Sequence, residues 1–190
     1  YKDDFKTPDW AKSGVMYQIF VDRFCKGNKK VPVRKDCKIN GDWYEGIPEF
    51  AEKNGDPLEN NMFFGGTLWG VIEKLDYLKE LGVDILYLCP IFKAFSNHKY
   101  DTGDYETVDE MFGGDKAFDE LIKEAKKRDM KIILDGVFNH TGDDSKYFNR
   151  YGKYKNVGAY QSEKSKYSDW YKFESFPDKY EAWWGIEILP

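Results

Sequence analysis

Two short segments gather side chains that could bind or transform a polar ligand. Residues 96–105, SNHKYDTGDY, hold an amide, an imidazole, two phenols and two carboxylates within ten positions. Residues 135–140, DGVFNH, add a carboxylate, an amide and the second of the two histidines in the chain. Imidazole and carboxylate groups exchange protons and hydrogen bonds near neutral pH, so both segments are candidates for a functional site.

Each candidate segment lies beside an apolar run that predicts a β-strand. Residues 85–89, ILYLC, are almost continuously apolar and stop at Pro90, as a parallel strand covered on both faces would. Residues 15–20, VMYQIF, and residues 131–138, KIILDGVF, predict two more strands. The second candidate segment therefore begins within the third strand and runs past its end.

The side chains at the end of the third strand could serve a ligand or only the fold. Strand alternation would place Asp135 and Asn139 on one face, with His140 just beyond them. An unpaired charge at the end of a buried strand is costly, so Asp135 must meet a cation, hydrogen-bond donors or a polar ligand. The alternative is that Asp135 and Asn139 pin neighbouring loops and that His140 bonds to the backbone. The Tyr100 side chain could likewise fill the core or face a ligand.

Two segments between the strands have helical periodicity. Thr67 is the predicted N-cap of the first helix, and Gly82 is the glycine that ends it. Residues 116–128 predict the second helix, and its basic residues come late, where the helix dipole favours them. The apolar faces are Leu68, Val71, Ile72, Leu75, Leu78 and Leu81 in the first helix, and Phe118, Leu121, Ile122 and Ala125 in the second.

Strands that alternate with helices predict an α/β fold with a parallel sheet. The two candidates are a doubly wound sheet and a (β/α)8 barrel, of which three strands would form only a part. In both folds ligands bind beyond the carboxyl ends of the strands, where the candidate segments fall. Residues 1–138 form the predicted α/β part, and residues 139–190 predict an irregular subdomain inserted after the third strand.

The predicted subdomain is rich in aromatic residues and poor in aliphatic ones. Its Trp and Tyr side chains could stack on sugar rings or could pack the subdomain itself; they include Trp170, Tyr171, Trp183 and Trp184. Residues 63–67, FFGGT, precede a helix but match neither GxxxxGK[ST] nor GxGxxG. They predict a tight approach of strand to helix rather than a phosphate site.

Composition argues against several classes of partner. Lys and Arg number 29 against 34 Asp and Glu, and the basic residues are scattered, so we expect no nucleic-acid partner. No apolar run reaches the roughly 20 residues of a membrane helix, and the N-terminal YKDDF lacks a signal-peptide pattern, so we expect a cytoplasmic protein without a membrane partner; the alternative is a secreted protein. The three cysteines have no zinc spacing and are expected to be free thiols; the alternative is a bridge between Cys25 and Cys37.

Five segments in this order resemble the α-amylase family of glycoside hydrolases, and most closely its neopullulanase and cyclomaltodextrinase branch. They are YQIFVDRF (17–24), FFGGTLWGVIEKLDYLKELGV (63–83), LYLCPIF (86–92), SNHKYDTGDY (96–105) and DGVFNH (135–140). The resemblance implies a partial (β/α)8 TIM barrel with an inserted subdomain after strand 3. The chain would carry three strands, two helices and most of the insertion, and we expect the native protein to be longer.

The resemblance also implies roles for individual residues. Tyr100 would be the aromatic platform under the sugar at the cleavage point, and His140 would bond to the primary hydroxyl of that sugar. His98 would lie at the same subsite. Asp135 would hold an arginine of a later strand, and Asn139 would brace the inserted subdomain. The implied substrate-binding set is therefore His98, Tyr100 and His140, and the supporting set is Asn97, Asp101, Asp135 and Asn139.

The chemistry that the resemblance implies lies outside these motifs. It is a retaining cleavage of α-1,4 or α-1,6 glucosidic bonds, with an Asp nucleophile on the fourth strand and a Glu acid/base on the fifth, about 5 to 5.5 Å apart. The 190 residues contain no GxRxD stretch, so we expect no catalytic residue and no hydrolysis by this chain alone. The implied ligands are maltooligosaccharides, cyclodextrins or pullulan. The alternative is a non-catalytic α-glucan-binding protein on a partial barrel.

Two further expectations concern metals and association. The branch often binds calcium beside the first strand, and calcium needs six to eight oxygen ligands. Here the loop at 25–35 reads CKGNKKVPVRK and Thr67 stands at an acidic position of the family, so we expect no cofactor, with calcium as the alternative. A partial barrel also leaves apolar sheet edges exposed, which favours association into a homo-oligomer or partial disorder.

Overall fold

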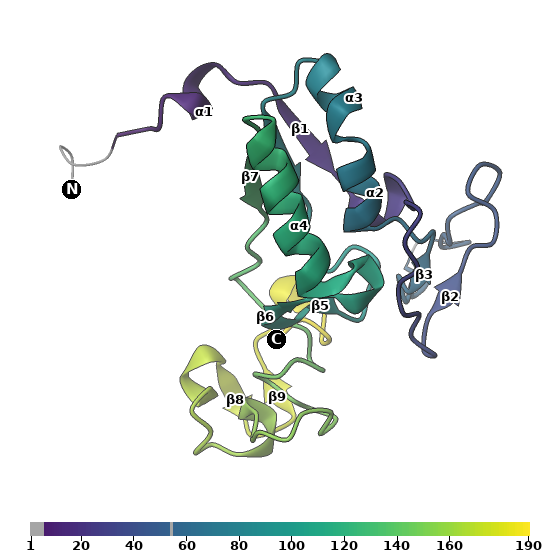
Figure 1. The fold of residues 1–190 in the computed structure, drawn as a ribbon. Helices are drawn as coiled ribbons and strands as arrows, with labels where there is room; N and C mark the ends of the chain where they lie inside the picture. The colour runs from purple at the N-terminus through teal and green to yellow at the C-terminus, as the bar shows by residue number, and fades with distance from the viewer. Residues whose placement is uncertain (1–5, 54) are drawn as a thin grey trace.

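A three-stranded parallel sheet lies at the centre of the computed structural model, which describes residues 6–53 and 55–190. Its strands are β1 (Met16–Ile19), β4 (Ile85–Leu88) and β7 (Lys131–Leu134), in the order β1-β4-β7. Figure 1 labels the two outer strands, β1 and β7. All pairs are parallel, which confirms the α/β class and the three predicted strands. The N-terminal YKDDF, to which the signal-peptide expectation applied, lies outside the described residues.

The carboxyl ends of the three strands lie at one edge of the sheet. Ile19 pairs with Leu88, and Leu88 pairs with Leu134. The predicted third strand is too long, because β7 ends at Leu134 and only one further bond, from Asp135 N to Leu88 O at 3.1 Å, extends the pairing. The prediction that Asp135 and Asn139 share a strand face is therefore wrong: both residues lie in irregular backbone.

The helices confirm the predicted positions with one correction. The first predicted helix is two helices, α2 (Leu68–Glu73) and α3 (Leu75–Glu80), because the backbone of Lys74 leaves the helical region at φ −100° and ψ 2°. The hydroxyl of Thr67 caps α2 by accepting from Gly70 N at 3.1 Å. The second helix is α4 (Gly114–Lys127), which begins two residues before the predicted start.

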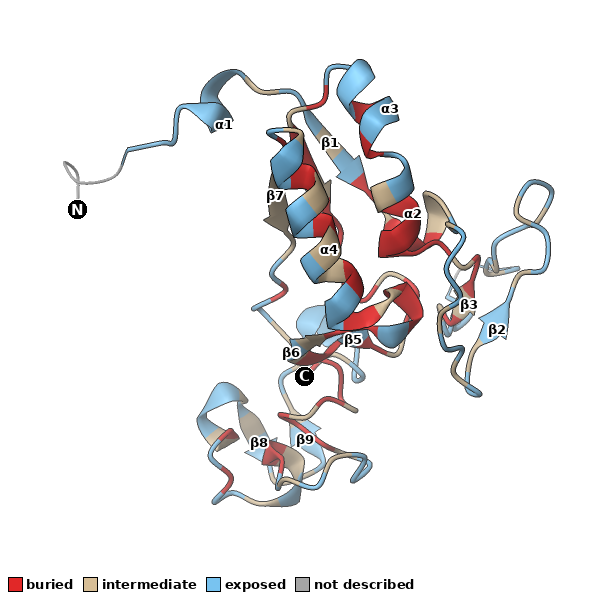
Figure 2. Cartoon of the chain, viewed as in Figure 1, coloured by how far each residue is buried: buried red, intermediate tan, exposed pale blue. Residues whose placement is uncertain are grey.

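The helices cover one face of the sheet. Their buried side chains meet the strands in a main cluster, which includes Ile19, Leu68, Val71, Leu75, Leu78, Leu86, Leu88, Ala117, Leu121 and Ala125 (Figure 2). Two residues of the predicted apolar faces, Leu81 and Ile122, are exposed. On the uncovered side of the sheet Met16 and Gln18 are exposed and Tyr87 is half-buried. The expectation that residues 85–89 are covered on both faces is therefore wrong for Tyr87.

Short elements outside the α/β pattern were not predicted. The largest is an antiparallel hairpin of β5 (Phe92–Ala94) and β6 (Thr102–Val108), whose connecting loop and second strand carry the first candidate segment. Strands of two or three residues have no readable periodicity, and β6 is largely polar, which explains why the sequence did not reveal them. Besides single turns of 3-10 helix, the described residues also form α1 (Trp10–Ser13), β2 (Lys38–Ile39), β3 (Met62–Phe63), β8 (Phe173–Ser175) and β9 (Lys179–Tyr180).

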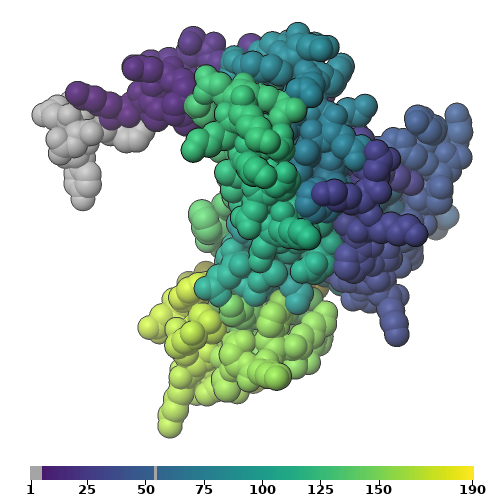
Figure 3. Space-filling view, viewed as in Figure 1, coloured from purple at the N-terminus to yellow at the C-terminus, as the bar shows by residue number. Residues whose placement is uncertain are grey.

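Residues 141–190 form a lobe, coloured light green to yellow in Figure 3. The structure describes all of these residues, and none of them is in an α-helix. Its core is a second, aromatic cluster made of Tyr147, Phe148, Ala159 and Tyr167, with Tyr105, Tyr160, Tyr171, Phe173 and Tyr180 packed around them. The two ends of the lobe meet, because Thr141 N donates to Pro190 O at 3.1 Å and Asp143 N donates to Ile188 O at 3.0 Å. Within the described ranges no helix has the length and apolar character to cross a membrane.

Candidate functional site

Tyr100 and Asp135 from the two candidate segments form one hydrogen-bonded pair. The Tyr100 hydroxyl donates to Asp135 Oδ2 at 2.8 Å, and the Tyr100 residue is 38% exposed. The core-filling alternative for Tyr100 is therefore wrong. The bond supplies the donor that Asp135 was expected to need, and it fixes the plane of an accessible aromatic ring at the carboxyl end of the sheet.

His140 reaches the same segment from the other side. Its Nε2 lies 2.9 Å from the carbonyl oxygen of Tyr100, so Nε2 carries the hydrogen. Its Nδ1 lies 3.4 Å from the side-chain amide of Asn139, which is placed to donate to it. Both ring nitrogens thus have protein partners. A sugar hydroxyl could take the place of the long Asn139 bond without disturbing the bond to Tyr100.

His98 lies beside Tyr100 with its ring centroid 5.9 Å from the phenol ring. Its Nδ1 accepts from Tyr100 N at 3.1 Å and lies 3.1 Å from Ser96 Oγ. The Ser96 hydroxyl donates to Asp101, and Asp101 also accepts from Ser96 N at 3.0 Å. Ser96 and Asp101 therefore close a tight loop that holds His98 against Tyr100.

A buried ion pair stabilises this loop on its interior side. Lys99 is fully buried, and its Nζ lies 2.6 Å from Asp109 Oδ2 between the rings of Phe63 and Phe112. Burial lowers the pKa of the Lys99 ammonium, and the negative charge of Asp109 opposes this effect. Lys99 also has a left-handed backbone, with φ 62°, so the ion pair fixes the turn that directs His98 and Tyr100 outward.

Asn97 and Asp101 are placed to hold loops rather than to touch a ligand. The Asn97 side chain donates to Met62 O at 2.9 Å, and Asn97 N donates to Asn60 O at 2.7 Å. These bonds join the first candidate segment to the neighbourhood of β3. Asn97 is 8% exposed and Asp101 is 7% exposed, so neither side chain offers a free surface to a large ligand.

Tyr105 connects the two candidate segments, although sequence reasoning gave it no role. Its hydroxyl contacts the carbonyl oxygens of Val137 and His140, the latter at 2.9 Å. Burial raises the pKa of Tyr105 to about 12, so the phenol stays protonated and remains a donor. The only sequence signal was its place within SNHKYDTGDY, since nothing in the sequence indicates which carbonyl groups it would meet.

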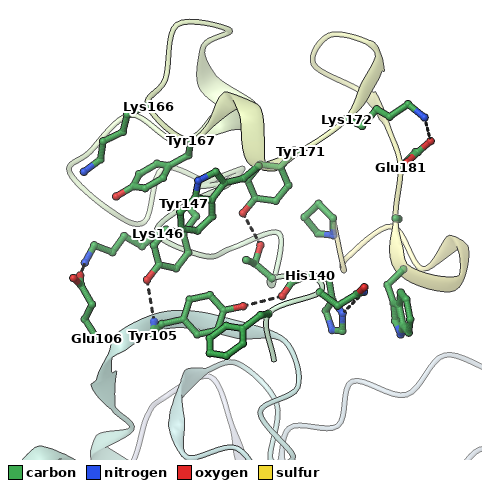
Figure 4. A pocket seen from close by; sticks show the side chains of 17 residues that line it. Tyr105, Glu106, His140, Lys146, Tyr147, Lys166, Tyr167, Tyr171, Lys172 and Glu181 are labelled. Carbon is green, nitrogen blue, oxygen red and sulfur yellow. Dashed lines mark hydrogen bonds and ion pairs between the residues drawn. The ribbon is translucent and has the colours of Figure 1, made fainter. Parts of the chain in front are cut away.

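A cavity of about 1010 Å³ opens between β6, the chain after β7 and the lobe (Figure 4). Asn139, His140 and Trp183 lie on its wall, whereas Tyr100, His98 and Asp135 are not among its lining residues. The wall is largely aromatic, with Tyr105, Phe138, Tyr147, Tyr167, Trp170 and Tyr171. Ion pairs of Lys146 with Glu106 and of Lys172 with Glu181 flank it.

Burial lowers the pKa of both histidines at the site. His98 and His140 are therefore neutral at pH 7, and each can accept one hydrogen bond and donate another. Burial and the neighbouring carboxylate of Asp135 raise the pKa of Tyr100, so this phenol also stays neutral. The ring surfaces at the site thus carry no charge, which suits a neutral ligand with many hydroxyl groups.

The residues beside the first strand do not fit a calcium ion. The buried carboxylate of Asp22 already accepts from Phe64 N at 3.0 Å and Gly65 N at 3.0 Å. The Thr67 hydroxyl donates to Lys26 O at 2.7 Å. The remaining side chains of this loop are mainly cationic, and across residues 6–53 and 55–190 no three His, Cys, Asp or Glu side chains are grouped to hold a metal.

The structure confirms what the sequence predicted for the glycines of residues 63–67 and for the three cysteines. A Cβ on Gly66 would lie 2.0 Å from Val21 O, and one on Gly70 would lie 2.0 Å from Cys25 O. The backbone after β1 thus packs directly on this segment, as the tight-approach prediction requires. Cys25, Cys37 and Cys89 are free thiols, which excludes the Cys25–Cys37 bridge.

Comparison with known proteins identifies the family. The family model described as "Alpha amylase, catalytic domain" matches residues 18–184. The chain is 49% identical to an amylopullulanase of Thermoanaerobacterium saccharolyticum over 179 residues, and 46% identical to neopullulanase 2 of Thermoactinomyces vulgaris over 139 residues. This chain belongs to the α-amylase catalytic domain family.

A solved structure of the family has the same fold over this region. The chain superposes on a cyclic α-maltosyl-(1→6)-maltose hydrolase of Arthrobacter globiformis with a TM-score of 0.76 and 32% identity, over 98% of this chain and 38% of that one. That enzyme was solved in complex with cyclic α-maltosyl-(1→6)-maltose. The fold is therefore that of part of an α-amylase family TIM barrel.

The chain spans a small part of its relatives. The matches cover 86% of this chain but 14% of the amylopullulanase, and 73% of this chain but 22% of the neopullulanase. Activity and substrate are properties of the whole enzymes, so for this chain they are proposals.

Proposed function

We propose that this chain forms the N-terminal part of the catalytic barrel of a retaining α-glucan hydrolase that cleaves α-1,4 and, in some substrates, α-1,6 glucosidic bonds. The observation that carries this is the cluster of Tyr100, Asp135 and His140 at the carboxyl end of the parallel sheet. TIM-barrel enzymes bind substrate at this end. The names of the relatives, amylopullulanase and neopullulanase 2, support the same substrate class.

The geometry suits one glucosyl unit at the cleavage point. The exposed ring of Tyr100 offers an apolar plane for the C–H face of a pyranose, and Asp135 holds that plane still. His140 offers its Nδ1 to a sugar hydroxyl, while its Nε2 stays on Tyr100 O. His98 lies on the neighbouring edge of the phenol ring. These residues bind and orient the sugar, and the nucleophile and the acid/base are proposed to come from outside this sequence.

The two parts of the chain have different proposed roles. Residues 1–138 are proposed to be the start of the barrel, and residues 139–190 a subdomain inserted after its third strand. Its separate aromatic cluster and the bonds that join its two ends support this division. Asp22 and Thr67 already have protein partners, which supports the proposal that no calcium ion binds beside the first strand.

Titration of the chain with maltohexaose by calorimetry tests the sugar site. We expect measurable binding that Tyr100→Ala weakens by about tenfold or more, because the stacking plane is lost. Tyr44→Ala is the matched control, since Tyr44 is 91% exposed and distant in sequence from both candidate segments. Equal affinity of Tyr100→Ala and the unaltered chain would exclude Tyr100 as the platform.

A further inference from the structure

A second cavity, of about 180 Å³, opens where three parts of the chain meet. Its lining residues come from the loop before β2, from the hairpin of β5 and β6, and from the lobe. They are Arg34 and Asp36, then Lys93, Ala94, Phe95 and Gly103, then Asp144, Lys153 and Tyr154. We call this space the junction cavity. It shares no lining residue with the larger cavity or with the proposed sugar site.

The charged side chains of the junction cavity leave one positive charge uncompensated. The cations are Arg34, Lys93 and Lys153, and the carboxylates are Asp36 and Asp144. Lys153 Nζ lies 2.8 Å from Asp144 Oδ2. Arg34 Nε lies 3.3 Å from Asp36 Oδ1. Among the described residues no carboxylate pairs with Lys93, whose Nζ lies 5.1 Å from the centroid of the Tyr154 ring. The cavity therefore favours an anion.

Arg34 has a donor that the described residues do not use. Its two terminal nitrogens donate to Ala94 O at 2.7 Å and to Phe95 O at 2.6 Å, which holds the guanidinium at the cavity wall. Its Nε is buried and has no hydrogen-bond partner within the described ranges, although the Asp36 carboxylate is near. A buried donor without an acceptor is costly, so a ligand oxygen at this place would stabilise the site.

The Tyr154 hydroxyl is a second unused donor. In the part of the chain that the structure describes, this hydroxyl has no hydrogen-bond partner. Burial raises the pKa of Tyr154, so the phenol stays protonated and can donate. A Cβ added to Gly103 would lie 3.5 Å from the hydroxyl. The missing side chain at Gly103 therefore leaves space beside this donor.

Size and chemistry together define the occupant of the junction cavity. A water molecule takes up about 30 Å³ of liquid, so the cavity has room for about six waters, and it is smaller than the roughly 300 Å³ at which pockets for drug-sized ligands begin. The occupant must be small, negatively charged and rich in acceptors. A phosphoryl group meets these conditions, because its tetrahedral oxygens accept from donors that approach from several directions.

We propose that the junction cavity binds a small phosphoryl oxyanion, either inorganic phosphate or the phosphate group of a small monoester, on Arg34, Lys93 and Tyr154. Such a ligand would bridge the loop before β2, the hairpin and the lobe. Arg34 also holds Ala94 O and Phe95 O, directly before residues 96–105, so a bound phosphate would stabilise the backbone that leads to Tyr100. The proposal uses no residue of the proposed sugar site and is independent of it.

Calorimetric titration of the native protein that carries this sequence with inorganic phosphate, at an ionic strength held constant with sodium chloride, tests the site. We expect Lys93→Gln to weaken phosphate binding by about threefold to tenfold, because the uncompensated charge is lost. Tyr154→Phe removes only the unused hydroxyl and should weaken binding by about twofold or more. Asp144→Asn should strengthen binding, because it frees Lys153. Lys164→Gln, at an exposed lysine of the lobe outside the cavity, is the matched control and should have no effect.

The opposite signs expected for Lys93→Gln and Asp144→Asn make the test decisive. Phosphate affinity that is equal in all variants, or weaker in Asp144→Asn, would overturn the proposal, as would a folded protein that binds no phosphate. Acetate that binds as tightly as phosphate would overturn the phosphoryl assignment. Glycerol 2-phosphate distinguishes the two sources: tighter binding than that of inorganic phosphate supports a monoester as the ligand, and weaker binding supports free phosphate.

Discussion

The main cluster and the aromatic cluster hold the same chain together by different means. In the main cluster aliphatic side chains recur at helix and strand spacing, and the elements that carry them provide the backbone hydrogen bonds. In the lobe the aromatic cluster packs around Phe148, and isolated turns and side-chain bonds replace regular elements. The site lies where the two parts meet, with Tyr100 on the barrel side and Trp183 on the lobe side. A regular frame thus positions Tyr100, and an irregular lobe shapes the wall of the cavity.

A substitution in the main cluster or in the aromatic cluster should destabilise that cluster and leave the other intact. Phe148 is fully buried among four aromatic rings, so Phe148→Ala should cost about 3 to 5 kcal/mol of local stability. Hydrogen exchange should show faster exchange in residues 145–180 and unchanged protection in α4. Leu75→Ala, also at a fully buried position, is the matched control and should produce the reverse pattern. Uniform loss of protection in both variants would show that the clusters unfold as one.

On the barrel side, the loop that carries His98 and Tyr100 depends on a buried charge pair. Lys99→Met should cost about 3 to 5 kcal/mol, because Asp109 would keep a buried carboxylate without its cation. Urea unfolding measures the loss. The double variant Lys99→Met with Asp109→Leu should recover part of it, since no charge is then left unpaired. A double variant less stable than Lys99→Met alone would mean that the pair contributes net stability beyond the avoided desolvation.

The helical frame should be sensitive to its cap. Thr67→Ala removes the acceptor for Gly70 N and should cost about 1 kcal/mol. Thr67→Ser keeps a hydroxyl at the same place and should cost less. Thermal unfolding of the three proteins compares them, and an Ala variant as stable as the Ser variant would show that the cap does not contribute.

The smallest expected effect is a dependence of the free energy of unfolding on pH, caused by His98. Burial lowers the pKa of His98 below its ordinary value of 6.5, so the unfolded chain takes up this proton more readily than the folded one. The stability that neutral His98 provides is complete above pH 6.5 and is lost as the pH falls below it. Protonation also removes the acceptor for Tyr100 N. His98→Asn should flatten the fall in unfolding free energy between pH 7 and pH 5; an unchanged slope would assign the effect to other groups, such as His140.

The periodicity of the sequence predicted the regular elements of the fold. The three strands, the helix faces, the Thr67 cap and the glycine at Gly82, whose φ is 87°, all follow from local spacing. The same reasoning failed where an element ends without a local signal. It extended the third strand past Leu134 and missed the break at Lys74, because both depend on tertiary packing.

The sequence indicated several of the residues that the structure brings together, but not the hydrogen bonds that connect them. The motifs singled out Tyr100, Asp135 and His140, yet the bond between the first two joins positions 35 residues apart. Lys99 gave no sign that it would be fully buried, because its partner Asp109 becomes a neighbour only through the hairpin of β5 and β6. The stack of Trp183 on His140 depends on a chain reversal that has no periodic pattern.

The stereochemistry of cleavage by the native protein that carries this sequence tests the central claim most directly. Proton NMR of maltohexaose during the first minutes of reaction identifies the anomer that forms first. A retaining α-glucan hydrolase releases the α-anomer, which then mutarotates, and we predict this result together with a lower rate in Tyr100→Ala. Initial release of the β-anomer, or a folded protein that cleaves neither maltohexaose, cyclodextrin nor pullulan, would contradict the account.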